Sequence, residues 1–224
     1  MNTKQLRWIF LSLIATVLVG ACVIPPVSVG FTYTIDDKGH HVSGGTNPVM
    51  ICFALAFLLL YINTMLSDSP ATGAPLPGVF RRFVAFYVDF IFAILTIAPI
   101  IGIVPMLIEW RTTREFAWTF ARDRAASSDA LVAPFTIVVT FAGLALWYAL
   151  PLVFGRPTPG PLVLGYQIVS ADTHPLTWPK AIKRVLLGFV ATGAWFLAPF
   201  INRDKTNGQF WLDKVFKTRA VKLT

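Results

Sequence analysis

Long apolar runs are the feature of this 224-residue sequence that most constrains its fold. A helix needs about 20 mostly apolar residues to cross the hydrocarbon core of a bilayer, which is about 30 Å thick. Four runs are close to that length or longer, and a fifth is shorter: Trp8–Val29, Val49–Leu66, Phe83–Ile108, Leu131–Phe154 and Val185–Ile201. We therefore predict an all-α polytopic membrane protein with four transmembrane helices and a short re-entrant or interfacial fifth apolar helix.

Charged residues are few and unevenly placed. They make up 13% of the chain, about half the share found in a typical soluble domain. The net charge of +8 comes from Lys and Arg beside the apolar runs, a distribution typical of membrane topology and not of nucleic-acid binding. It predicts a multi-pass membrane protein with both termini in the cytoplasm. A fully spanning Val185–Ile201 would export the basic C-terminal tail, so we expect this run not to span.

A linker over residues 67–78 divides the chain, because its Pro, Gly, Ser and Thr cannot form a core. It separates an N-terminal transmembrane hairpin, residues 1–66, from a membrane domain, residues 79–224. Within the first part, Phe31–Ile35 and His41–Ser43 alternate in polarity around a turn. This pattern predicts a small extracytoplasmic β-hairpin between the first two helices.

The cysteines and histidines lack the spacing of a metal site, and we predict neither a metal nor a cofactor. Cys22 and Cys52 lie inside apolar runs, which favours a packing role. Residues 19–22 also resemble a lipoprotein cleavage box, so removal of the first apolar segment stays open. His40 and His41 are adjacent in an extended segment, and their side chains should point to opposite faces.

Asp89 is the only charged side chain well inside an apolar run. At about 1.5 Å per helical residue it lies about 10 Å beyond Arg82 along the helix axis. A carboxylate at that depth costs several kcal/mol unless it is paired, hydrated or protonated. We expect a base from another segment, Arg156 or Arg184, because the Arg82 side chain leans toward the headgroups.

Small and polar residues follow one side of the same run. Members of this stripe recur at spacings of three and four: Arg82, Ala85, Asp89, Ala93 and Thr96. Small residues let membrane helices approach closely, so the stripe should face protein and Asp89 should point inward. Such a carboxylate serves either proton-coupled transport or a hydrogen-bonded lock between helices, and the sequence leaves both open.

Further elements are predicted on the cytoplasmic side of the membrane. After a turn rich in glycine and proline, Val163–Val169 is predicted to form a short strand, and Pro179 to begin a basic amphipathic helix. We expect an ion pair from Asp213 to Arg82 or Arg81, which would tie the C-terminal tail to the start of the third apolar helix. The alternative is a solvated Asp213 on a surface turn.

Several of these residues form a pattern in chain order. Arg82, Ala85 and Asp89 open it, and the later members are Gly155, Thr158, Gly160, Gly165, Arg184 and Asp213. Over about Pro77–Val221 the chain resembles the RDD family of bacterial integral membrane proteins. The family usually has lysine where Pro161 stands, which weakens the case for a phosphate or headgroup contact at that position.

The resemblance implies a transport or transport-assisting role, since cation/proton exchange is suggested for some members, and Asp89 would then bind the proton or cation. The alternative is a non-catalytic accessory, assembly or protective subunit of another membrane complex. No catalytic arrangement is apparent, so we do not expect an enzyme. The expected partners are the bilayer, anionic lipid headgroups at Lys180, Lys183 and Arg184, and a second copy or another membrane protein.

Overall fold

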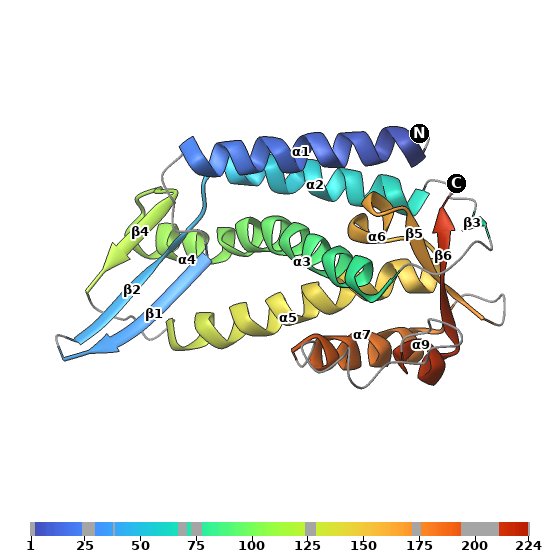
Figure 1. The fold of residues 1–224 in the computed structure, drawn as a ribbon. Coiled ribbons are helices and arrows are strands. Elements are labelled where there is room, and N and C mark those ends of the chain that lie inside the picture. Colours follow the sequence, from blue (N-terminus) through green and yellow to red (C-terminus); the bar gives the residue numbers. More distant parts are fainter. Residues whose placement is uncertain are drawn as a thin grey trace. The chain divides into compact units, whose positions relative to one another are not determined.

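The computed structural model describes residues 3–23, 30–37, 39–66, 71–72, 78–123, 129–171, 176–193 and 211–223. Its helices are α1 (Thr3–Val23), α2 (Pro48–Leu66), α3 (Val79–Ile101), α4 (Ile103–Thr113), α5 (Asp129–Phe154), α6 (Pro159–Val163), α7 (Trp178–Gly193) and α9 (Trp211–Phe216). Its strands are β1 (Gly30–Asp36), β2 (Gly39–Gly45), β3 (Ala71–Thr72), β4 (Thr119–Arg122), β5 (Tyr166–Ser170) and β6 (Thr218–Leu223) (Figure 1).

Most of the described chain is helical, as expected for a polytopic membrane protein. Among the described residues, three helices are long and apolar enough to cross a membrane: Pro48–Leu66, Phe80–Thr113 and Leu131–Phe154. The described apolar part of α1, Gln5–Val17, is shorter, so a fourth span stays a prediction. The predicted class, all-α with one β-hairpin, has too few strands, because the described strands form two three-stranded sheets, β1-β2-β4 and β3-β6-β5.

Some predictions fall on residues outside the described ranges. Residues 194–201 are among these, so whether Val185–Ile201 spans the membrane stays a prediction. Most of the linker at residues 67–78 also lies outside. Helix α1 continues through Cys22, and cleavage there is not tested by the fold.

The chain forms two compact units, each built from separate stretches of sequence. The first unit comprises Met1–Thr16, Leu60–Phe92 and Ala145–Thr224, and the second comprises Val17–Leu59 and Ala93–Leu144. Aromatic contacts hold the helices of the first unit together. The Tyr61 and Trp147 rings stack with centroids 4.1 Å apart, and the Tyr61 hydroxyl donates to the Trp147 carbonyl. Such contacts matter here because lipid gives apolar side chains little reason to associate.

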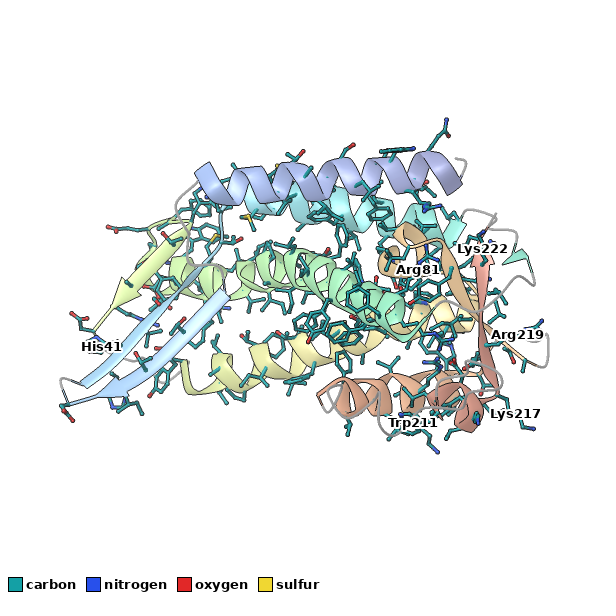
Figure 2. All side chains as sticks on the ribbon, in the orientation of Figure 1. His41, Arg81, Trp211, Lys217, Arg219 and Lys222 are labelled. Carbon is teal, nitrogen blue, oxygen red and sulfur yellow. The ribbon has the colours of Figure 1, made fainter. Side chains whose placement is uncertain are left out.

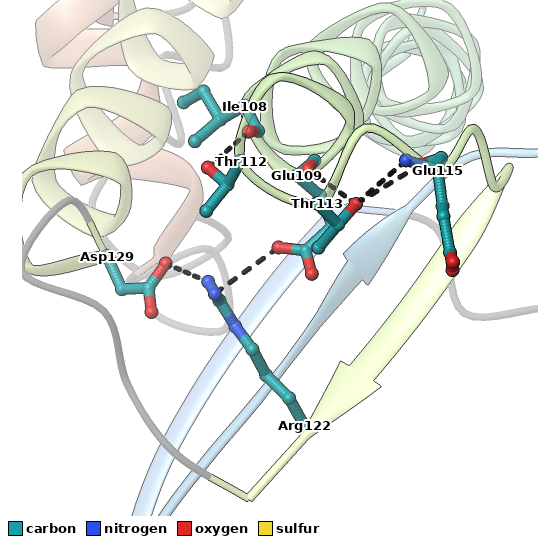
Figure 3. Close-up of polar contacts among 7 residues, drawn as sticks. All are labelled: Ile108, Glu109, Thr112, Thr113, Glu115, Arg122 and Asp129. Atoms are coloured by element: carbon teal, nitrogen blue, oxygen red, sulfur yellow. Dashed lines mark hydrogen bonds and ion pairs between the residues drawn. The ribbon is translucent and has the colours of Figure 1, made fainter.

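The second unit contains the predicted β-hairpin. Strands β1 and β2 pair antiparallel from Gly30 opposite Gly45 to Asp36 opposite Gly39, which confirms the prediction. Strand β4 adds to the other edge of β2, a pairing that the sequence did not indicate. In Figure 3, Arg122 of β4 reaches between two carboxylates, Glu109 of α4 at 3.3 Å and Asp129 of α5 at 2.6 Å. These ion pairs connect the sheet of this unit to both helices.

A break at Gly102 divides the predicted span Phe83–Ile108 into α3 and α4, and α4 continues past the predicted end. Pro99 and Pro105 lie on either side of the break, and each removes one backbone donor from the helical ladder. Gly102 also packs closely against the hairpin. A β-carbon at this position would lie 3.1 Å from the carbonyl carbon of Gly45.

The two ends of β2 allow a matched test of close packing. Gly39 and Gly45 have φ of 128° and 134°, so alanine at either position adds strain of about 1–3 kcal/mol. Only at Gly45 would the new β-carbon clash, because it would lie 2.7 Å from Thr119 Cα. We expect Gly45→Ala to lower the thermal unfolding midpoint in detergent well beyond Gly39→Ala, by roughly another 1–3 kcal/mol of stability. Equal midpoints for the two variants would show that this packing is wrong.

Candidate functional site

Asp89 lies on the buried side of α3, with 2% of its surface exposed. Ala85 and Ala93 on the same stripe are buried as well, whereas Phe90 is exposed. The predicted inward orientation of the stripe is therefore confirmed. The carboxylate belongs to α3, within the apolar helical stretch Phe80–Thr113, which is long enough to cross a membrane.

Two donors from the segment after α5 bind the Asp89 carboxylate. The Thr158 hydroxyl donates to Oδ2, and the Gly160 N–H donates to Oδ1 at 2.6 Å. Thr158 is the N-cap residue of α6, and its own side chain makes no capping bond. Asp89 therefore accepts, from another helix, one of the N–H groups that the start of α6 leaves without an intrahelical partner.

The prediction of an arginine partner for Asp89, either Arg156 or Arg184, is wrong. A hydroxyl and a backbone amide take that place. The physical reason is that neutral donors stabilise a buried anion without bringing a second ion out of water, which itself costs several kcal/mol. Counting charges along the sequence could not reveal such donors.

Close backbone packing brings α6 to the carboxylate. A β-carbon at Gly160 would lie 2.8 Å from the carbonyl carbon of Ala85 and 3.0 Å from Cγ of Asp89. The first distance is shorter than those of real β-carbons and the second is tighter than most of them, so only glycine fits against α3 here. Gly155 and Gly165 have φ of 63° and 72°, and they turn the chain on the two sides of α6.

Asp213 anchors a second buried cluster in the same unit. It accepts from Arg82 of α3, from Arg184 of α7 at 2.6 Å and from the Thr218 hydroxyl at 3.0 Å. The predicted ion pair between Asp213 and Arg82 is confirmed. The expectation that Arg184 binds lipid headgroups is wrong, because its side chain is buried against Asp213. Its spacing from Lys180 and Lys183 suggested one common face, but only the lysines are exposed.

This cluster places one carboxylate between two guanidinium groups. The Asp213 side chain is fully buried, and Arg184 is nearly so. Burial lowers the pKa of the Arg184 guanidinium, and the neighbouring Asp213 charge acts in the opposite direction. Arg82 Nε and Nη2 are buried with no hydrogen-bond partner among the described residues. The negative charge of Asp213 therefore compensates the burial of the Arg82 and Arg184 guanidinium groups.

Tyr166 lies between the two clusters and was not singled out as a site residue from the sequence. It is buried in a group with Ala85 of α3 and Ala220 of β6. Burial raises the pKa of its hydroxyl, and the charge of Asp89 raises it further. The available signal was the strand alternation after Gly165, which puts Tyr166 and Ile168 on one face. That face packs on the polar stripe of α3.

The described residues contain no group of three or more His, Cys, Asp or Glu able to hold a metal ion. The residues that the sequence singled out instead form two clusters in the first unit. Asp89, Thr158 and Gly160 form one, beside Ala85, and Arg82, Arg184 and Asp213 form the other. Helix α3 contributes to both, so it connects α6 to α7 and to the C-terminal segment.

Removing the charge of Asp213, at the centre of the second cluster, should lower the stability of the protein. Asp213→Asn leaves two buried guanidinium groups without a counter-charge, and we expect a loss of about 3–5 kcal/mol in stability. Adding Arg82→Gln should recover part of this loss, which a double-mutant cycle of thermal unfolding midpoints measures. Arg219→Gln, on an exposed position of β6, is the control and should change the midpoint little. An effect of Asp213→Asn as small as the control would contradict the buried pair.

Comparison with known proteins gives one assignment. The model of the RDD family matches residues 76–217, which confirms the resemblance over about Pro77–Val221. No curated protein matches the chain, and no solved structure matches it either. The matched residues contain both buried clusters except Thr218. The chain belongs to the RDD family, and its long apolar helices are those of a membrane protein.

Proposed function

We propose that the protein is a transport or transport-assisting integral membrane protein in which Asp89 binds an exchangeable proton or small cation. The observation that carries this proposal is the kind of donor around the carboxylate. Both oxygens of Asp89 accept from neutral groups, Thr158 and Gly160. Its charge is therefore not cancelled by a fixed ion pair, and a proton can neutralise it without separating two buried ions.

Asp213 provides the contrast within the same unit. Its carboxylate is held between Arg82 and Arg184, so protonation would leave two guanidinium groups facing each other. Asp213 is thus held in fixed ion pairs, whereas Asp89 is held by neutral donors. In this proposal Asp213 sets the position of α3, and Asp89 carries the exchange.

Exchange at Asp89 would act on α6. The deprotonated carboxylate accepts both the Thr158 hydroxyl and the Gly160 N–H. Binding of a proton to Oδ2 makes that oxygen a donor, so the Thr158 hydroxyl must rotate and accept. The bonds that hold α6 then weaken, because hydrogen bonds to a charged acceptor are about twice as strong as neutral ones. Opening of α6 would give the site access to water.

We place the protein in the bacterial cytoplasmic membrane with both termini in the cytoplasm, on the charge distribution beside the apolar runs. The spans are few for a pore, so a second copy or a membrane-protein partner would complete the pathway. No enzymatic activity is proposed.

An accessory, assembly or protective subunit is the second candidate, and close packing at Asp89 favours it. The backbone of Gly160 lies directly on that of Ala85, an arrangement suited to a permanent lock between α3 and α6. In that role the hydrogen bonds of Asp89 matter and its charge does not. Isolation from mild detergent as a lone monomer, without a co-purified protein, would count against this candidate.

Two substitutions separate charge from hydrogen bonding. Asp89→Asn removes the charge but can still accept from Gly160 and donate to Thr158, whereas Thr158→Val keeps the charge and removes one donor. The measurement is cation-gradient-driven proton flux in proteoliposomes, followed with an internal pH-sensitive dye and Na⁺ or K⁺ as the cation. We expect Asp89→Asn to reduce flux at least on the order of tenfold, and Thr158→Val to retain flux at an altered rate.

Folding of both variants is checked by their thermal unfolding midpoints before flux is compared. Wild-type flux in a folded Asp89→Asn protein would eliminate the transport role of Asp89. Absence of flux in the wild type with either cation would favour the accessory role.

A further inference from the structure

The described side chains of the first unit carry exposed charge of one sign only. Among its described side chains, every exposed charged residue is basic: Arg81, Lys180, Lys183, Lys214, Lys217, Arg219 and Lys222. The acidic residues described in this unit, Asp89 and Asp213, are both buried. Asp213 is bound by two arginines inside the unit.

Strand β6 arranges part of this surface. Thr218, Ala220, Val221 and Leu223 are buried, whereas Arg219 and Lys222 are exposed. Figure 2 shows Lys217, Arg219 and Lys222 along this strand, with Lys217 at its α9 end. Both edges of β6 are paired, with β3 and with β5, so its position is fixed by backbone bonds. Arg219 and Lys222 are therefore held in place by a sheet.

Helix α7 adds an apolar component to the same unit. Trp178, Leu186 and Val190 are exposed, whereas Ala181 and Val185 are buried in the core. Lys180 and Lys183 are exposed near the start of the helix. Exposed apolar side chains next to basic ones are typical of a helix that lies at the surface of a bilayer. A soluble nucleic acid or an acidic protein would match the cations but not the exposed leucine and valine.

We infer that this cationic surface, which comprises Lys180 and Lys183 of α7, Lys214, Lys217, Arg219 and Lys222 around β6, and Arg81, binds the phosphate groups of anionic phospholipids. The exposed apolar side of α7 then rests at the boundary between headgroups and acyl chains. Basic residues near an anionic bilayer surface each contribute favourably to binding, within a Debye length of the surface. This surface is separate from Asp89 and does not depend on its role.

The test compares two matched double variants of the full chain in detergent. Lys217→Gln/Arg219→Gln removes two exposed cations from the surface, and Arg111→Gln/Arg114→Gln removes two exposed cations from the second unit. Each pair includes one residue with positive φ, Lys217 at 50° and Arg114 at 62°, so backbone strain is matched. Phosphatidylglycerol, phosphatidylcholine or inorganic phosphate is added, and the thermal unfolding midpoint is measured, since a ligand of the folded state raises it.

Phosphatidylglycerol should raise the midpoint of the wild type and of the Arg111/Arg114 control more than phosphatidylcholine does. The Lys217/Arg219 variant should bind phosphatidylglycerol on the order of tenfold more weakly, and added salt should reduce the effect in every protein. An equal response of all three proteins would overturn the assignment. Equal stabilisation by inorganic phosphate, or stabilisation by a short oligonucleotide in place of lipid, would also overturn it.

Discussion

The hydrogen bonds that α6 and its N-cap residue donate to Asp89 are the constraint on which the rest of the first unit depends. A carboxylate in an apolar helix costs several kcal/mol without compensation. Here the compensation comes from Thr158 and Gly160, and it requires the backbones of α3 and α6 to touch. Gly160 permits that contact, because a side chain there would meet the carbonyl of Ala85. The need to satisfy one acid therefore explains a glycine, a threonine and a turn far from it in sequence.

The second buried acid, Asp213, is stabilised by positive charges. Asp213 is surrounded by charge, with Arg82 and Arg184 on its two oxygens, and it ties three segments that are distant in the chain. The two buried acids thus differ in their partners: Asp89 is held by neutral donors and Asp213 by cations. Their burial also leaves the exposed charges of the described first unit entirely basic. The proposed lipid-binding surface and the proposed exchange site can then belong to one unit without sharing residues.

Features that depend on the periodicity of the sequence could be predicted, whereas contacts between segments distant in the chain could not. The spacing of small residues placed Asp89 inward, and hydrophobic alternation placed the hairpin β1–β2. Strands β4 and β6 were not anticipated, because each is short and pairs with a segment remote in the chain. The partner of Asp89 was missed for a related reason. A backbone N–H has no signature in the sequence, and its value to an anion arises only when a helix start is brought against it.

Exchange of the Gly160 amide hydrogen, measured by NMR on the protein in lipid nanodiscs, tests whether this amide is bound to Asp89. We expect slow exchange in the wild type, faster exchange in Asp89→Asn, whose neutral amide accepts more weakly, and exchange faster by orders of magnitude in Asp89→Ala. The Leu162 amide, which donates to the Thr158 carbonyl within α6, reports whether α6 itself has unfolded. A Gly160 amide that exchanges equally fast in the wild type and in Asp89→Ala would contradict the hydrogen bond between this amide and Asp89.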